Sequence, residues 1–251
     1  MPGISYSDKV ALITGAGSGI GRTTAQAFAA AGAKVVVSDI VPVGGEVTVE
    51  QIRAEGGEAI FVAADVADEA SVRNLVARAI GEYGRLDCAF NNAGISEGNL
   101  PGQEWDTEIF MRSFDVNTKG VFLCMKYEIE HMLAQGHGAI VNAASVAGMV
   151  SYGAFAYTAS KHAVVGLTRT AAVQYSARGI RVNCVCPGAI RTPMVQTAID
   201  QGFGSVIEAM HPIGRIGEPI EVAEAVLWLC SDHASFVTGH PLAVDGGALA
   251  R

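Results

Sequence analysis

The chain has 251 residues, of which 50% are hydrophobic and 17% charged, and its net charge is −8. This acidic balance argues against a nucleic-acid partner, because a nucleic-acid surface needs clustered lysine and arginine side chains. The first residues lack a basic region followed by an apolar run, and no apolar stretch approaches the roughly 20 residues of a membrane span, so we expect a cytoplasmic protein with no membrane partner.

Short β-branched runs alternate with longer helical patterns along the whole chain. Strands are predicted at residues 10–14, 34–38, 59–64, 86–90, 139–142, 181–186 and 242–245. Helices are predicted at residues 20–31, 45–55, 69–83, 105–135, 156–176 and 219–231. Apolar strands separated by helices indicate a parallel sheet covered on both faces. The sequence therefore predicts one α/β domain over residues 1–251, doubly wound and Rossmann-like, with about seven strands.

Residues 189–217 are the exception to this alternation, because their signals are mixed. A stretch of that length without clear periodicity in a compact domain is usually a functional loop or lid. We expect a substrate-binding lid that orders when the substrate binds and excludes water from the site.

A glycine-rich segment, Thr14-Gly-Ala-Gly-Ser-Gly-Ile-Gly21, follows the first strand and opens the first helix. Glycines let the backbone turn tightly and approach a ligand, and the helix then presents free N–H groups and a positive dipole end to an anion. In doubly wound sheets the first βα turn is where dinucleotides bind. A plain glycine-rich turn is the alternative, and a Walker loop is excluded because no Lys-Ser or Lys-Thr follows. The expected cofactor-binding residues here are Gly15, Ser18, Gly19, Ile20 and Gly21.

Asp39 ends the second strand, eighteen residues after Gly21. A carboxylate there can accept hydrogen bonds from the adenosine ribose hydroxyls and repels a 2′-phosphate. The glycine segment holds no basic residue and Ile40 follows Asp39, so the pattern favours NAD over NADP. An ordinary strand-end aspartate is the alternative. Asp65 and Val66, after the third strand, are expected at the adenine edge, although Asp65 could instead cap the next helix.

Tyr157 and Lys161 are four residues apart in a predicted helix, so both side chains share one face. A neighbouring ammonium favours the charged form of a phenol, and we therefore expect the pKa of Tyr157 to fall below its reference of about 10. Such a phenol can exchange a proton with an alcohol or a carbonyl oxygen. The pair alone is a weak signal, because both residues are common on helices.

In combination these motifs resemble the short-chain dehydrogenase/reductase family over essentially the whole chain. The glycine segment resembles its cofactor motif, and Asn91-Asn-Ala-Gly94 resembles its signature after the fourth strand. Asn117, Ser145, Tyr157 and Lys161 match its catalytic tetrad in order and spacing. Through segments 121–126 and 211–215 the chain most resembles bacterial NAD-dependent dehydrogenases of secondary, often cyclic, alcohols and of dihydrodiols.

This resemblance implies roles for the tetrad. Tyr157 would act as acid/base on the substrate oxygen while hydride passes to or from the nicotinamide, and Ser145 would donate a hydrogen bond to the same oxygen. Lys161 would lower the tyrosine pKa and bind the nicotinamide ribose, and Asn117 would fix a water beside it. Ser145 as a turn cap and Asn117 bonded to backbone are the alternatives. Further expected cofactor residues are Asn91, Ala93, Gly94, Pro187, Gly188, Ile190 and Thr192.

The segments expected around the substrate are mostly apolar and uncharged. They favour a hydrophobic secondary alcohol or ketone over a phosphorylated sugar or a carboxylate held by an arginine clamp. The expected pocket residues are Ile95, Ser145, Val146, Met149, Tyr152, Tyr157 and Met194. The resemblance also implies a homotetramer.

The five cysteines include no Cys-x-x-Cys pair, which argues against both a disulfide framework and a zinc site. Buried thiols are the expected state, and Cys184 and Cys186 should point to one face of a strand. The histidines lack metal-ligand spacing, so no metal is expected. His162, beside Lys161, is more plausibly structural than a base, because neighbours on a helix point in different directions.

Three functions are weighed. The leading one is an NAD-dependent oxidoreductase of hydrophobic secondary alcohols or ketones. A 3-oxoacyl carrier-protein reductase usually uses NADPH, which Asp39 opposes. A non-catalytic dinucleotide-sensing or scaffold protein typically loses the tyrosine or the lysine, and this chain keeps both.

Overall fold

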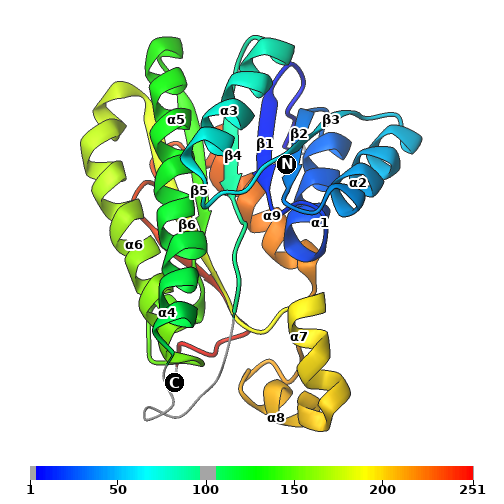
Figure 1. Ribbon diagram of the computed structural model, residues 1–251, viewed down its shortest axis with the longest axis vertical. Helices are drawn as coiled ribbons and strands as arrows, with labels where there is room; N and C mark the ends of the chain where they lie inside the picture. The colour runs from blue at the N-terminus through cyan, green and yellow to red at the C-terminus, as the bar shows by residue number, and fades with distance from the viewer. Residues whose placement is uncertain (1–3, 97–105, 251) are drawn as a thin grey trace.

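The computed structural model describes residues 4–96 and 106–250. Its core is a parallel sheet of seven strands in the order β3-β2-β1-β4-β5-β6-β7 (Figure 1). The strands are β1 (Val10–Thr14), β2 (Lys34–Asp39), β3 (Glu58–Ala63), β4 (Cys88–Asn91), β5 (Gly138–Ala143), β6 (Ile180–Pro187) and β7 (Pro241–Val244). The strand order reverses between β1 and β4, where doubly wound sheets form their ligand cleft at the carboxyl ends of the strands. The predicted fold class is confirmed.

Helices cover both faces of the sheet. α1 (Gly19–Ala30), α2 (Pro42–Ala54) and α9 (Pro219–Cys230) lie on one face, and α3 (Glu69–Tyr83), α5 (Gly120–Gln135) and α6 (Phe155–Tyr175) lie on the other (Figure 1). Successive residues of β1 point to opposite faces of the sheet. Leu12 packs in the core with α5 and α6, and Ile13 packs in the core with α1 and α9. All five residues of β1 are buried, as a strand covered on both faces requires.

Local signals set the helix bounds where they are strong. α3 begins after Asp68, whose side chain accepts a 3.0 Å hydrogen bond from the Ser71 N–H, and it ends at Gly84, which adopts a left-handed conformation with φ of 75°. The predicted bounds of this helix, 69–83, are therefore confirmed.

Two predicted segments differ from the structure. The long helix predicted at 105–135 is divided into α4 (Thr107–Phe114), a π-helical turn (Asp115–Lys119) and α5, and residue 105 lies outside the described residues. Residues 189–217 are not an irregular loop, because they contain α7 (Pro193–Ala198), α8 (Gly204–Ala209) and a π-helical turn between them. Neither α7 nor α8 buries a residue, so no apolar period marked them in the sequence.

The segment from 189 to 217 is closed at its base by backbone contacts. Ile190 and Gly217 form an isolated parallel bridge, and the Arg191 N–H donates to the Gly217 carbonyl at 2.8 Å. In Figure 1 the segment projects from the end of the sheet, with α7 and α8 away from the other helices. A segment that projects from the sheet and whose two ends are joined by backbone contacts is consistent with the predicted lid. Its motion stays a prediction.

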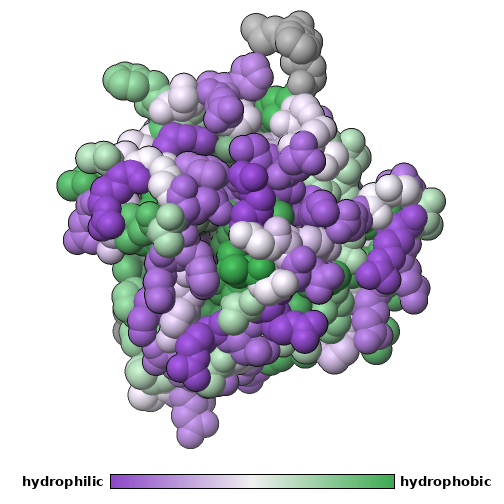
Figure 2. Space-filling model, turned by 90° about the horizontal axis from the view of Figure 1, so that it is seen from above, coloured by the Kyte–Doolittle hydropathy of each residue, from purple (hydrophilic) through white to green (hydrophobic). Residues whose placement is uncertain are grey.

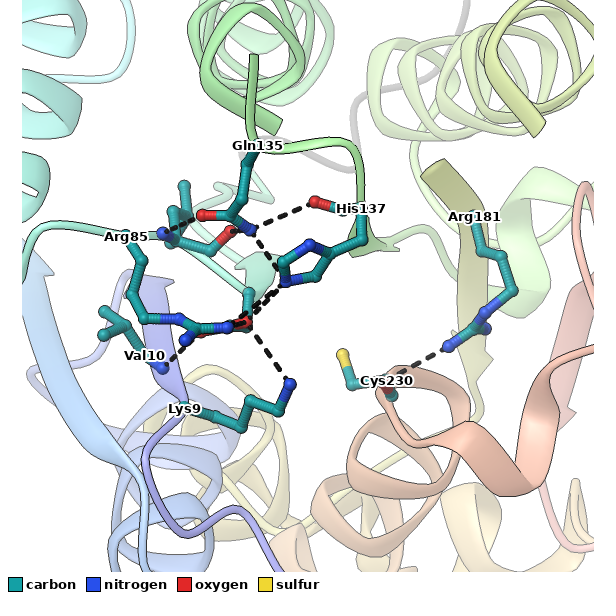
Figure 3. Close-up of polar contacts among 9 residues, drawn as sticks. Lys9, Val10, Arg85, Gln135, His137, Arg181 and Cys230 are labelled. Carbon is teal, nitrogen blue, oxygen red and sulfur yellow. Dashed lines mark hydrogen bonds and ion pairs between the residues drawn. The ribbon is translucent and has the colours of Figure 1, made fainter. Parts of the chain in front are cut away.

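A charged cluster joins the amino ends of β1, β4 and β5 (Figure 3). The carboxylate of Asp87 accepts from Arg85 at 2.7 Å and from the Val10 N–H at 2.9 Å, and it lies 3.0 Å from the His137 ring. Burial raises the pKa of Asp87, but the hydrogen bonds from Arg85, Val10 and His137 outweigh it and leave that pKa lowered. The charged cluster around Asp87 is a structural anchor of the sheet.

Figure 2, viewed from the end away from α7 and α8, shows a largely hydrophilic surface with a few apolar side chains in a central hollow.

None of the described helices is long and apolar enough to span a membrane.

Candidate active site

A cleft of about 400 Å³ lies at the carboxyl ends of the strands, between the β1–α1 turn, the ends of β4, β5 and β6, and α7. The predicted residues that line it are Gly15, Ser18, Gly19, Ile20, Asp39, Asp65, Val66, Ala93, Gly94, Ile95, Ser145, Tyr157, Lys161, Pro187, Gly188, Ile190, Thr192 and Met194. Predicted residues outside the lining are Gly21, Asn91, Asn117, Val146, Met149 and Tyr152. Lining residues that sequence reasoning missed are Ser38, Ile40, Ala64, Asn92, Arg112, Val116, Ala143, Ala144 and Pro193.

The glycine turn approaches its neighbours too closely for side chains. Gly15 and Gly19 have φ of 62° and 52°, the left-handed region that favours glycine. A Cβ on Gly15 would lie 2.9 Å from the Ala93 Cα, and a Cβ on Gly21 would overlap the Gly15 carbonyl oxygen. Gly21 is therefore a packing residue that lets α1 start against the turn, and it does not itself line the cleft.

The amino end of α1 faces the cleft through Ser18, Gly19 and Ile20. Ser18 is the N-cap residue, yet its side chain makes no capping hydrogen bond. The first N–H groups of a helix have no partner within the helix, so here they remain available to an anion. This bare helix end and the narrow glycine turn fit the pyrophosphate of a dinucleotide.

Asp39 holds the other side of the turn. Its Oδ2 accepts from the Gly17 N–H at 2.8 Å, and its Oδ1 accepts from the Val41 N–H at 2.9 Å. The carboxylate thus lies against the glycine turn at the edge of the cleft. Arg22, the residue that directly follows the glycine segment, directs its guanidinium to the Gly17 carbonyl and to the Thr48 hydroxyl.

Asp65 also lines the cleft, but it does not cap α3. Its Oδ1 accepts from the Ala67 N–H at 2.9 Å, while Asp68 is the N-cap residue of that helix. The alternative role that the sequence left open for Asp65 therefore belongs to Asp68.

Asn92, not Asn91, faces the glycine turn. The Asn92 Nδ2 donates to the carbonyl oxygens of Thr14 at 2.9 Å and Gly15 at 3.1 Å. Asn91 is 1% exposed and donates instead to Glu128 and Asn142 in the protein core. The placement of Asn91 in the cleft was wrong, because consecutive residues at the end of a strand point to opposite sides.

Ser145, Tyr157 and Lys161 meet at one end of the cleft. Ser145 is within hydrogen-bonding reach of Tyr157, and its Oγ also accepts from the Ala147 N–H at 3.1 Å, so the capping role left open in the sequence is present too. Lys161 is 4% exposed, and its ammonium lies 5.5 Å from the centroid of the Tyr157 ring and donates to the Ala143 carbonyl at 2.7 Å. The helix spacing of Tyr157 and Lys161 thus brings the two side chains together, as predicted.

The electrostatics of the pair differ from the prediction. Burial raises the pKa of Tyr157, and the hydrogen bond from Ser145 only partly offsets that rise. Burial also lowers the pKa of Lys161 to about 8. The expected fall in the tyrosine pKa is therefore wrong for the protein alone, because desolvation of the phenolate is the largest effect on that pKa.

Asn117 lies in the π-helical turn and joins two segments of the site. Its Oδ1 accepts from the Ile95 N–H at 2.8 Å, and its Nδ2 donates to the Ile95 carbonyl at 2.9 Å and to Ser160 Oγ at 3.0 Å. The amide is bonded to backbone, the alternative that the sequence left open, and both of its N–H donors are used. A Cβ on Gly94 would lie 3.1 Å from Asn117 Oδ1 and 3.3 Å from Lys161 Nζ, so a small residue keeps this corner clear.

The apolar residues of the lining include Ile95, Ile190, Met194 and Val195. Three predicted pocket residues point elsewhere: Val146 is 2% exposed in the core, Met149 faces solvent, and the Tyr152 hydroxyl contacts the Met210 sulfur at 3.0 Å. The cleft is also not free of charge, because Arg112 of α4 lines it. No short-range pattern distinguishes Arg112 from other helix-surface arginines, and only the packing of α4 shows its position.

The described residues hold no cluster of three or more possible metal ligands. All five cysteines are buried free thiols, and Cys184 and Cys186 belong to the same core cluster, both as predicted. His162 is exposed and contacts the Thr158 carbonyl through its Nδ1 at 2.9 Å. That contact places its ring against its own helix.

A family model of short-chain dehydrogenases/reductases, described as "Enoyl-(Acyl carrier protein) reductase", matches residues 15–248. The chain belongs to the short-chain dehydrogenase/reductase family. It is an oxidoreductase of that family. A 2,5-dichloro-2,5-cyclohexadiene-1,4-diol dehydrogenase of Sphingobium indicum is 50% identical over 245 residues, which are 96% of this chain and 97% of that protein.

Two further relatives bear on substrate and cofactor. A cyclohexanol dehydrogenase of Acinetobacter sp. (strain SE19) is 45% identical over 242 residues, 96% of this chain and 95% of that protein. A solved structure from Beutenbergia cavernae, described as a candidate NAD(P) dependent gluconate 5-dehydrogenase with NADP bound at low occupancy, superimposes with a TM-score of 0.93 at 36% identity, covering 99% of both chains.

Proposed function

We propose that this protein is an NAD-dependent oxidoreductase that interconverts a hydrophobic secondary, cyclic alcohol and its ketone. The observation that carries the proposal is the geometry of the cleft. Ser145, Tyr157 and Lys161 lie at one end, and the bare amino end of α1 with Asp39 lies at the other. A dinucleotide that spans this distance would bring its reactive ring to the tyrosine.

The choice of NAD rests on Asp39. Both carboxylate oxygens are held by backbone N–H groups at the glycine turn, so a negative charge is fixed where an adenosine ribose would lie. Ribose hydroxyls can donate to that carboxylate, whereas a 2′-phosphate would be repelled. Arg22, the basic side chain next to the turn, is already bonded to Gly17 and Thr48. The Beutenbergia cavernae structure contains NADP, which makes cofactor choice the first point to test.

Tyr157, Ser145 and Lys161 each have a separate role in the proposed reaction. Tyr157 takes the hydroxyl proton in alcohol oxidation and returns it to the carbonyl oxygen in ketone reduction. Ser145 donates a hydrogen bond to the same oxygen and stabilises the charge that develops there. Lys161 places a positive charge over the tyrosine ring and has further N–H donors for a ribose. An oxidised nicotinamide, when bound in this cleft, would supply the hydride acceptor, and its positive charge would favour the phenolate of Tyr157.

The substrate class follows from the lining of the cleft. Ile95, Ile190, Met194 and Val195 are apolar residues that line the same cleft as Tyr157, and an apolar lining suits a hydrocarbon ring. The relatives named for a cyclohexadiene diol and for cyclohexanol support this class.

Two finer expectations also belong to this proposal. The exposed aromatic side chains Phe122 and Phe155, on α5 and α6, support a homotetramer, which light scattering at several concentrations would test. We also propose a cytoplasmic location, which the free state of all five cysteines supports.

The decisive experiment is a spectrophotometric screen of cyclic and open-chain alcohols and ketones with NAD(H) and NADP(H) at equal concentration. The proposal expects the highest kcat/KM with a cyclic alcohol and NAD. A strong NADPH preference with 3-oxoacyl substrates would favour the carrier-protein reductase. NADH binding without turnover of any compound would favour a dinucleotide sensor.

A further inference from the structure

An acidic side chain is buried beneath the cleft and forms no ion pair with a described residue. Glu128, on α5, is 0% exposed. Its Oε2 accepts a 3.0 Å hydrogen bond from Asn91 Nδ2 at the end of β4. A buried carboxylate without a counter-charge is costly, so such a group tends to take up a proton.

The other oxygens of the same two side chains lack partners. Glu128 Oε1 and Asn91 Oδ1 are both buried, and neither has a hydrogen-bond partner among the described residues. As long as the carboxyl is ionised, both atoms are acceptors and each is left unsatisfied, at a cost of about 1–3 kcal/mol per group. A single proton on Glu128 would turn its unpartnered oxygen into a donor and so supply the hydrogen bond that both atoms lack, in two side chains that are already joined through Asn91 Nδ2 and Glu128 Oε2.

We infer that Glu128 is held as a neutral carboxylic acid that donates its proton to the Asn91 side-chain oxygen, and that this acid–amide pair is a positioning element for the cofactor cleft. Burial raises the pKa of Glu128 to about 7, while the hydrogen bond from Asn91 acts in the opposite direction. The pair therefore changes its protonation near neutral pH.

Hydrogen bonds connect the pair to both sides of the cleft. Asn91 Nδ2 also donates to Asn142 Oδ1 at 3.0 Å, and Asn142 Nδ2 donates to Thr168 Oγ1 at 3.0 Å on α6, the helix of Tyr157 and Lys161. The residue after Asn91 is Asn92, which holds the glycine turn. The residue after Asn142 is Ala143, whose carbonyl accepts from Lys161.

Within the described part of the chain, no positively charged group shifts the pKa of Glu128. Cys124 lies one turn earlier on α5. Burial is the main cause that raises the pKa of its thiol, and the negative charge of Glu128 raises that pKa further. Asn91 of β4, which donates to Glu128, is neutral, and so are Asn142 of β5 and Thr168 of α6, which continue the same chain of hydrogen bonds. Charged or titratable side chains on the neighbouring elements are engaged elsewhere: Glu69 of α3 with Lys126, Lys161 of α6 with Ala143, and Cys184 and Cys186 of β6 with each other.

Ionisation of Glu128 has a defined consequence. The carboxylate can no longer donate to Asn91 Oδ1, and two buried acceptors are then left without a partner among the described residues. Asn91 must turn or shift, and it shares a backbone with the residues that hold the glycine turn. We expect the cleft to bind a dinucleotide less tightly once Glu128 is charged.

The first test compares unfolding of the wild type, Glu128→Gln and Glu130→Gln. Glutamine keeps the acceptor and replaces the acid proton with an N–H donor, and Glu130 is an exposed residue of the same helix. The folded wild type holds one more proton than the unfolded chain between the ordinary pKa of 4.5 and the raised value of about 7. Its unfolding constant should therefore rise about tenfold for each pH unit in that window relative to Glu128→Gln. Glu130→Gln should follow the wild type, and parallel curves for all three proteins would overturn the neutral acid.

Infrared spectroscopy of the wild type needs no variant and guards against poor folding of Glu128→Gln. A protonated carboxyl band should persist above the pH at which exposed carboxyls ionise and should disappear around pH 7. The absence of that band at pH 6 would equally overturn the neutral acid.

The second test measures NADH affinity by fluorescence across the same pH range and two units above it. This readout rests on the proposed function, whereas unfolding and infrared do not. The affinity of the wild type and Glu130→Gln should fall several-fold through pH 7, and that of Glu128→Gln should not. Equal pH dependence in all three proteins would overturn the positioning role. If none of them binds NADH at any pH, the proposed function and the positioning role both fail, and the unfolding result alone decides the neutral acid.

Discussion

The ammonium of Lys161 stands over the ring of Tyr157, 5.5 Å from its centroid, while its hydrogen bond goes to the Ala143 carbonyl. The cation is thus fixed in place by the end of β5 and not by the tyrosine hydroxyl. Burial raises the pKa of Tyr157, so the free protein holds a protonated phenol. Turnover in the two directions therefore begins from different protonation states of one residue.

Opposite pH dependence in the two directions follows from this. Alcohol oxidation needs the phenolate and should become faster as pH rises toward the tyrosine pKa. Ketone reduction needs the phenol and should become slower through the same range. The measurement is kcat/KM for one alcohol and its ketone across pH. A shared pH profile for both directions would contradict the assignment of a single acid/base.

Lys161 should cost stability at neutral pH. Its pKa falls from 10.5 to about 8 through burial, so the unfolded chain binds more protons between these values and the stability of the wild type rises with pH there. Lys161→Met removes this dependence. We expect the wild type to gain on the order of 3 kcal/mol relative to the variant from pH 8 to pH 10.5, by urea unfolding. Lys119→Met, at an exposed position, is the control and should not alter the slope.

Asp39→Asn should shift the enzyme from NAD toward NADP. The change removes the negative charge that repels a 2′-phosphate, although one of the two backbone hydrogen bonds from Gly17 and Val41 is lost with it. We expect the ratio of kcat/KM for NADP over NAD to rise by about tenfold to a hundredfold. Asp65→Asn, in the same cleft, should leave the ratio near that of the wild type. An unchanged ratio in Asp39→Asn would remove the argument for NAD.

Gly21 and Gly81 form a matched pair for the role of the glycine turn. An alanine at position 21 would overlap the Gly15 carbonyl, so we expect a loss of about 1–3 kcal/mol in the free energy of unfolding and weaker cofactor binding. Gly81 lies in α3, where a Cβ added to it would meet no described atom within 4 Å, and its replacement by alanine should stabilise the protein by about 0.5–1 kcal/mol. Equal thermal unfolding of the two variants would show that the turn tolerates a side chain.

The sequence predicted the elements with strong local signals. Asp68 and Gly84 mark both ends of α3, and the apolar run of β1 gives its bounds. The spacing of Tyr157 and Lys161 was sufficient to bring these side chains together, because a regular helix converts sequence spacing into geometry.

Other features depend on contacts between distant segments. The π-helical turn at Asn117 breaks a long helical pattern, and the partner of its side chain, Ile95, is 22 residues away. The pKa of Tyr157 depends on how completely the fold buries it, and the spacing to Lys161 carries no such information. Strand alternation was sufficient to predict that Asn91 and Asn92 point to opposite sides of β4. That Glu128 is the partner of Asn91 depends on the packing of α5 against β4, which the sequence does not reveal.

Tyr157→Phe tests the central claim most directly, because it keeps the ring and removes only the hydroxyl. We expect kcat to fall by about 10²- to 10⁴-fold in both directions while NADH affinity stays near that of the wild type. Tyr175→Phe, at the other end of α6, should retain activity and controls for the loss of a tyrosine hydroxyl from that helix. Near-normal turnover by Tyr157→Phe would contradict the assignment of the acid/base.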